Sequence, residues 1–200
     1  MGKQDQALNC LDEAIRVYRL FEDVMVDALA EVHEMKGDTL CEVKNYEIAI
    51  SMYRECLHVV DSQSNDDDYH AYDERVAELN YKLGRAFAET GEYDEAFDSY
   101  REAIRIFGRV LGNSDQRVGE VMYDVGLLIV KQGGDNVFAR AMECFDEIVR
   151  IFILKGKGRD VKVADALVQK SNLLANSSEF DPELDQAGSL LDEAVEIYKA

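Results

Sequence analysis

The residue types that support catalysis or metal binding occur in this chain, but not at the spacing that such chemistry requires. The run from His33 to Gly37 begins like the zinc motif H-E-x-x-H, yet a glycine stands where the second histidine ligand is needed. The segment Asn65–Asp68 lacks the glycine and the glutamate of a calcium-binding EF-hand loop. Adjacent acids such as Asp12 and Glu13 do not face each other on a helix. We therefore predict a protein without catalytic activity, metal or cofactor.

The histidines and cysteines favour structural roles. We expect His33, on a helix face, and His58, near a helix end, to be solvated or to cap a helix. No C-x-x-C pair occurs among the four cysteines, which are Cys10, Cys41, Cys56 and Cys144. We expect them to be reduced thiols that act as small buried apolar groups, and so to reside in a reducing compartment such as the cytoplasm.

Composition restricts the partners of the chain. Its 200 residues carry 41 Asp and Glu against 22 Lys and Arg, a formal net charge of −19. Nucleic acid and anionic membrane surfaces both attract basic proteins, so neither is an expected ligand. The longest purely apolar runs, Leu127–Val130 and Ile151–Leu154, are far shorter than the ~20 residues that span a bilayer. A single proline indicates long helices with short connections.

A small residue followed four positions later by a large apolar one recurs at intervals of 42 to 47 residues. The small residues are Ala7, Ala49, Ala96, Ala141 and Ala187. A period of this size is typical of stacked helical hairpins. We predict an all-α solenoid, a right-handed superhelix built as one repeat array over 1–200. Its expected elements are a lone second helix over 5–21 and helical hairpins over 23–60, 72–111, 115–154 and 161–199.

The stretch Tyr81–Gly112 carries the most informative spacing. It contains L-G-x-x-F followed by G-x-Y-x-x-A-x-x-x-Y-x-x-A, and so resembles a tetratricopeptide repeat. Gly84 and Ala96 allow the two helices to approach closely, and Tyr100 is expected to fill the space between this pair and the next repeat. The long period and the segment Ala103–Leu128, with its V-L-G step, resemble the repeats of kinesin light chains.

The resemblance implies a concave groove lined by the first helix of each hairpin, in which a partner peptide lies. Counting from the glycines of the first helices places these residues on the lining: Glu31, Glu34, Asp38, Glu78, Tyr81, Lys82, Arg85, Glu120, Tyr123 and Asp124. The corresponding residues of the last hairpin are Asp165, Val168, Gln169 and Asn172.

This lining is mostly carboxylates with two tyrosines, so we expect a basic or amphipathic protein segment as the partner, with the tyrosines as apolar anchors. A second interpretation is that these acids form a solvated face without a partner.

A different class of function is also compatible with the sequence. Apolar residues of the first helix, such as Leu11, have no preceding partner helix, and further apolar residues, such as Val195, lie where the chain ends inside the last second helix. They predict either a fragment of a longer array or self-association through the ends. The alternative function is therefore a structural subunit, packed permanently in a larger assembly through its apolar ends and its convex face.

Overall fold

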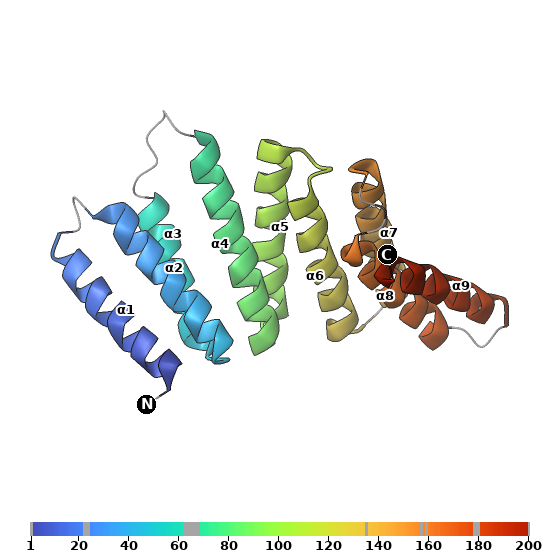
Figure 1. The fold of residues 1–200 in the computed structure, drawn as a ribbon, viewed down its shortest axis with the longest axis horizontal. Coiled ribbons are helices and arrows are strands. Elements are labelled where there is room, and N and C mark those ends of the chain that lie inside the picture. The colour runs from blue at the N-terminus through green and yellow to red at the C-terminus, as the bar shows by residue number, and fades with distance from the viewer. Residues whose placement is uncertain are drawn as a thin grey trace. The chain divides into compact units, whose positions relative to one another are not determined.

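The computed structural model describes residues 2–21, 25–61, 69–134, 136–156, 158, 160–177 and 181–199. Within these ranges the chain forms nine α-helices and no β-strand (Figure 1). The helices are α1 Lys3–Arg19, α2 Val26–Glu42, α3 Tyr46–Asp61, α4 Tyr69–Thr90, α5 Tyr93–Leu111, α6 Gln116–Gln132, α7 Val137–Leu154, α8 Val161–Ser177 and α9 Asp181–Tyr198. The predicted all-α fold is confirmed.

The helices follow each other as one single helix and four pairs. Helix α1 is not part of a hairpin, although it packs on α2. The pairs are α2 with α3, α4 with α5, α6 with α7, and α8 with α9. The single helix spans residues 3–19, and the four pairs span residues 26–61, 69–111, 116–154 and 161–198. The acidic segment Asn65–Asp68, between α3 and α4, lies outside the described residues. None of the described helices combines the length and the apolar character needed to cross a membrane.

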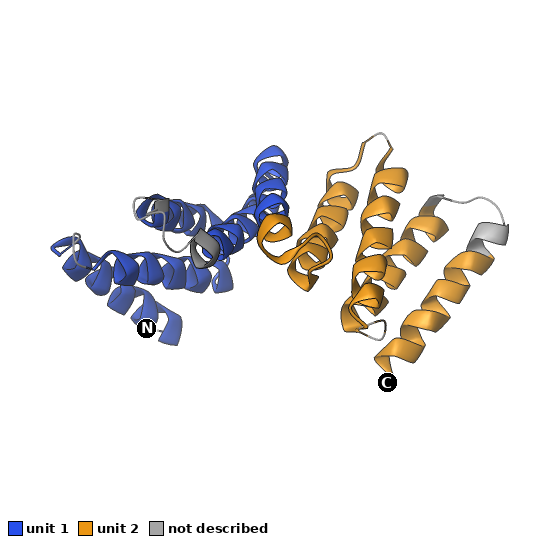
Figure 2. Ribbon diagram, turned by 90° about the horizontal axis from the view of Figure 1, so that it is seen from above, with its two compact units in different colours: residues 1–106 blue, residues 107–200 orange. Residues whose placement is uncertain are grey.

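The chain divides into two compact units, drawn in blue and orange in Figure 2. Unit 1 comprises Met1–Ile106 and contains α1 to α4 and most of α5. Unit 2 comprises Phe107–Ala200 and contains the last residues of α5 and α6 to α9. The single repeat array over 1–200 stays a prediction.

Close packing inside three hairpins depends on a glycine of the first helix that faces an aromatic ring of the second. The pairs are Gly37 with Tyr53, Gly84 with Tyr100 and Gly126 with Phe145. A Cβ atom on Gly84 would lie 2.5 Å from a ring carbon of Tyr100, closer than carbon atoms normally approach. The ring of Tyr100 thus packs on the first helix of its own hairpin, whereas we expected it to fill the space toward the next repeat.

The last hairpin replaces this contact with a hydrogen bond. Ser171 stands in α8 at the position of the glycines, and its side chain is buried. Its hydroxyl donates to the carbonyl of Ala187 in α9 over 2.9 Å. A buried hydroxyl needs such a partner, so the small polar residue is satisfied at the closest approach of the two helices.

His33 is buried, and the expectation that it is solvated or caps a helix is wrong. The side chain lies in the middle of α2 and is 1% exposed. Neither ring nitrogen has a hydrogen-bond partner among the described residues. The pKa of His33 is lowered because burial disfavours its charged form, and the charge of Arg19 on α1 lowers it further, while Glu55 on α3 opposes them. The ring is therefore neutral at pH 7.

The cysteines are free, as expected, but their burial differs. Cys56 is buried and its thiol donates to the carbonyl of Ala30 over 3.1 Å. Burial raises the pKa of Cys56 to about 11. Cys10 is exposed, so the prediction that all four thiols are buried is wrong for this residue.

The buried histidine should make the chain less stable in mild acid. The unfolded chain takes up a proton at His33 below about pH 6.5, whereas the folded chain does so only at a lower pH. Stability is therefore complete above pH 6.5 and falls as the pH drops below that value. We expect His33→Leu to raise the free energy of unfolding by about 1 kcal/mol at pH 7, because an unpartnered buried polar group is removed.

Denaturant unfolding at pH 7.5 and pH 5.5 checks this expectation. The variant should lose less stability than the wild type between the two values. An equal loss in both proteins would show that His33 does not cause the acid sensitivity. His58→Leu serves as the control, because this residue is exposed near the end of α3.

Candidate functional site

The ten residues predicted to line a groove come from the first helices α2, α4 and α6, and none of them is buried. Glu31 and Arg85 are exposed, and the other eight are half-buried. Within one helix, residues three, four or seven positions apart share a face. The candidates on each helix therefore form one polar face per helix. Whether these faces form a groove that binds a partner stays a prediction.

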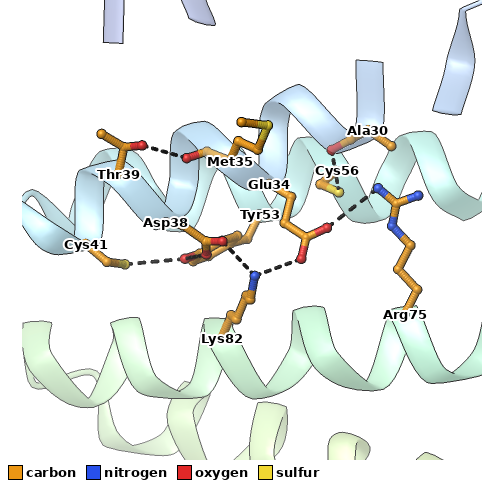
Figure 3. A network of polar contacts seen from close by, with 10 residues as sticks. All are labelled: Ala30, Glu34, Met35, Asp38, Thr39, Cys41, Tyr53, Cys56, Arg75 and Lys82. Atoms are coloured by element: carbon orange, nitrogen blue, oxygen red, sulfur yellow. Dashed lines mark hydrogen bonds and ion pairs between the residues drawn. The ribbon is translucent and has the colours of Figure 1, made fainter. Parts of the chain in front are cut away.

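In unit 1 a lysine of α4 lies between two acids of α2 (Figure 3). The Nζ atom of Lys82 lies 2.7 Å from Oε1 of Glu34 and 2.8 Å from Oδ2 of Asp38. All three were predicted as lining residues, and the structure brings them into direct contact. The ammonium group bridges the first helices of two successive hairpins, so it holds α2 and α4 at a defined distance.

Two further residues complete this polar network. Arg75, also on α4, lies 3.6 Å from Oε2 of Glu34, and the buried hydroxyl of Tyr53 on α3 donates to Oδ1 of Asp38 over 2.8 Å. Sequence reasoning did not assign a polar role to either residue. Burial, with hydrogen bonds to Cys41 and Asp38, raises the pKa of Tyr53 far above its usual range. The phenol therefore remains a neutral donor.

The network is electrically balanced, with two carboxylates and two cations. Burial opposes the charge on Lys82, but hydrogen bonds to Asp38 and Glu34 and the charges of these acids outweigh it, so the pKa of Lys82 is raised. The lysine thus stays an ammonium ion at neutral pH. This arrangement positions helices and contains no group poised for proton transfer.

The tyrosine predicted as an apolar anchor in α4 is held by neighbouring side chains. The ring centroid of Tyr81 lies 6.1 Å from that of Tyr100, and the guanidinium of Arg85 lies 5.9 Å from the centroid of Tyr81. Such ring–ring and cation–ring contacts fix the orientation of the side chain. Glu78, three residues before Tyr81, is half-buried on the same face.

The predicted tyrosine of unit 2 is also held from two sides. The rings of Tyr123 on α6 and buried Phe145 of α7 meet in an edge-to-face arrangement, with centroids 5.9 Å apart. The Nζ atom of Lys162 on α8 lies 5.2 Å from the centroid of Tyr123. Burial and the charge of Asp165 raise the pKa of Tyr123, so the phenol is neutral.

Two acids near this tyrosine, Glu120 and Asp165, accept hydrogen bonds from neutral donors. Oε1 of Glu120 accepts from the amide of Gln116 over 2.9 Å, and Oδ1 of Asp165 accepts from the hydroxyl of Tyr198 over 2.5 Å. This bond, followed by burial, raises the pKa of Tyr198 to about 12. Asp165 was assigned to the lining of the last hairpin, whereas the partnership with Tyr198 was not foreseen.

A sequence signal for the missed cations does exist. In each first helix one small residue contacts the second helix: Gly37, Gly84, Gly126 or Ser171. In three of the four first helices, a basic residue lies nine positions before this small residue. These basic residues are Arg75, Arg117 and Lys162. An acid lies six positions before that glycine or serine in all four, at Glu31, Glu78, Glu120 and Asp165. Aligning the first helices by this residue would therefore have shown the basic positions as well as the acidic ones.

The helical hairpins, the small residues at their contacts and the polar first helices together are features of one class of fold, the tetratricopeptide repeat. The sequence pattern of the tetratricopeptide repeat matches residues 77–109, which cover most of α4 and α5. The predicted resemblance and the predicted α-solenoid are confirmed. Repeats of this type are generally non-catalytic scaffolds for protein–protein interaction.

Individual proteins similar to this chain agree with that class. Protein KINESIN LIGHT CHAIN-RELATED 2 of Arabidopsis thaliana is 25% identical over an alignment of 197 positions that covers 94% of this chain and 28% of that protein. Nuclear autoantigenic sperm protein of Homo sapiens is 25% identical over 121 residues, which make up 60% of this chain and 15% of that protein. The chain thus spans less than a third of either relative.

Solved structures show the same fold. BtubC (BKLC) from P. vanneervenii superposes with a TM-score of 0.77 at 16% identity, covering 100% of this chain and 75% of that one. YrrB, described as a tetratricopeptide repeat protein with an unusual peptide-binding site, superposes with a TM-score of 0.59 at 17% identity, covering 96% and 80%. The likeness to kinesin-light-chain repeats is confirmed at the level of fold and repeat type.

Proposed function

We propose that this chain is a protein–protein interaction scaffold whose first helices bind a basic or amphipathic segment of a partner. The observation that supports it is the acid at the same position of every first helix: Glu31, Glu78, Glu120 and Asp165. All four are exposed or half-buried, and the net charge of −19 adds long-range attraction for a basic partner.

The two tyrosines of the first helices supply the apolar part of the proposed contact. Tyr81 and Tyr123 are both half-buried, and each ring is held by a buried aromatic residue of the second helix. A ring whose orientation is fixed in advance loses little entropy on binding, so it is suited to be an anchor. YrrB provides a precedent for peptide binding by this fold. We further propose that units 1 and 2 are consecutive parts of one repeat array.

The alternative function, a structural subunit of a larger assembly, is favoured by exposed apolar side chains of the first and last helices. Leu20 and Phe21, directly after α1, are 75% and 58% exposed, and Val195 of α9 is 44% exposed. Such residues would be covered in an obligate assembly. Light scattering over a wide concentration range separates the two functions, because the structural subunit would self-associate or aggregate when isolated.

Reversing the charge of the first-helix acids tests the scaffold. We expect Glu31→Lys/Glu78→Lys/Glu120→Lys to weaken binding of a basic amphipathic peptide by about tenfold or more, because each reversal turns attraction into repulsion. The probe is a fluorescein-labelled 18-residue peptide of leucine and lysine at helical spacing, measured by fluorescence anisotropy at low and moderate salt. Glu34 is left unchanged because it holds Lys82.

A matched control separates these faces from the overall charge. The variant Glu47→Lys/Glu143→Lys/Glu193→Lys changes the net charge equally, through exposed acids of the second helices α3, α7 and α9. It should retain affinity within about threefold of the wild type, since only the general field changes. If both variants weaken binding equally, the first-helix faces are not the binding surface. If the wild type does not bind the peptide, the proposed function is rejected.

A further inference from the structure

Three helices of unit 2 bring two tyrosines, an aspartate and a lysine together. We call this the tyrosine–aspartate cluster: Tyr123 of α6, Lys162 and Asp165 of α8, and Tyr198 of α9. Lys162 and Asp165 are three positions apart and so share one face of α8. The hydroxyl of Tyr198 reaches Asp165 over 2.5 Å, and the ammonium of Lys162 lies 5.2 Å from the ring centroid of Tyr123.

The ring of Tyr123 already accepts a cation. A separation of 5.2 Å between Nζ and the ring centroid is within the ~6 Å over which an aromatic face attracts an ammonium group. The ring is held by its contact with Phe145, which is fully buried. Because Phe145 also packs on Gly126 of α6, the ring of Tyr123 is attached to the core of its own hairpin. The cluster therefore presents a preorganised aromatic surface.

The negative charge of Asp165 remains in place beside this ring. The hydroxyl of Tyr198, its hydrogen-bond donor, is a neutral phenol, which orients the carboxylate without neutralising it. In unit 1, by contrast, Glu34 and Asp38 form ion pairs with Lys82. Tyr198 is 49% exposed, so the edge of the cluster is accessible from solvent. A carboxylate that accepts from one phenol and whose charge acts on a second is a combination that recognises ammonium and guanidinium groups.

We propose that Tyr123, Asp165 and Tyr198 hold one lysine or arginine side chain of the partner. The aliphatic stem would lie along the two rings and the charged head would pair with Asp165. Lys162 occupies the face of Tyr123 in the free protein, so it competes with the incoming cation. This inference rests on the proposed scaffold function and specifies the unit and the residues that contact a basic segment.

Single substitutions measured with the labelled leucine–lysine peptide test the assignment. Asp165→Asn retains an acceptor for Tyr198 but removes the charge, and should weaken binding by about tenfold. Tyr123→Leu should weaken it by about threefold to tenfold, whereas Tyr123→Phe should retain it, because phenylalanine keeps the aromatic face. Lys162→Gln should strengthen binding several-fold, since the competing ammonium is removed.

The matched control is Glu143→Gln, which removes the same charge from an exposed position of α7 in the same unit. Circular dichroism at each step establishes that helicity is unchanged. If Asp165→Asn and Glu143→Gln weaken binding equally, or if Lys162→Gln weakens it, the cluster does not hold the cation and the proposal is overturned. The scaffold function would survive that result, whereas a wild type that does not bind the peptide would overturn both.

Discussion

Replacing Gly84 with alanine should lower the free energy of unfolding by about 2 kcal/mol, although alanine is the better helix former by about 1 kcal/mol. The added methyl group would lie 2.5 Å from one ring carbon of Tyr100 and 2.6 Å from another. The ring is 2% exposed and cannot turn away into solvent. The two helices of the hairpin must therefore separate, or the ring must leave its preferred rotamer, and both cost packing energy.

The same chemical change at Gly188 should have the opposite sign. This glycine lies in the exposed face of α9, and a Cβ atom there would meet nothing within 4 Å. Gly188→Ala should stabilise the chain by about 0.5–1 kcal/mol, through helix propensity alone. Thermal unfolding followed by circular dichroism measures both variants. If both substitutions stabilise the protein, contact with the ring of Tyr100 is not the reason that a glycine occupies position 84.

The second large effect is expected at the polar network of unit 1. Glu34→Lys should lower the free energy of unfolding by about 2 kcal/mol, between the near-zero value of an exposed ion pair and the 3–5 kcal/mol of a buried one. The change removes one of the two acceptors of Lys82 and places a further cation near Arg75. The side chain of Glu34 is 22% exposed, so solvent relieves this repulsion only in part.

Two comparisons assign this loss to the contact between α2 and α4. Glu31→Lys makes the same change in charge one turn earlier in α2, at an exposed position, and should alter stability by no more than about 0.5 kcal/mol. Adding Lys82→Glu to Glu34→Lys restores opposite charges at positions 34 and 82 but sets a carboxylate beside Asp38, so it should recover only part of the loss. Equal stability of the Glu31→Lys and Glu34→Lys variants would show that the network contributes nothing to folding.

The helices could be predicted because local spacing determines them. The alanine markers and the turn at Gly91, which adopts a positive φ of 84°, fix where one helix ends and the next begins. The close approach of the two helices at Gly84 also follows from a short stretch of sequence, although the ring that meets this glycine, Tyr100, was assigned to the space toward the next repeat. Each of these features depends on residues of a single hairpin.

The polar network could be predicted only in part. Glu34 and Lys82 are 48 positions apart, and their pairing depends on which faces of α2 and α4 meet. The sequence of a first helix does not reveal whether its acids are solvated or form ion pairs with a neighbouring helix. His33 illustrates the opposite error, because a polar residue inside an amphipathic helix was assigned to solvent while the fold buries it.

The contact between Gly126 and Phe145 also suggests how repeats of this kind change during evolution. Their hairpin has three more residues between the two positions than the hairpins of Gly37 and Gly84, yet the ring still faces the glycine. The two side chains share a fixed volume, so enlarging one requires the other to shrink. Where Ser171 replaces the glycine, the residue four positions after Ala187 is Leu191, not a ring. We expect substitutions at these paired positions to covary among homologous sequences, independently of loop length.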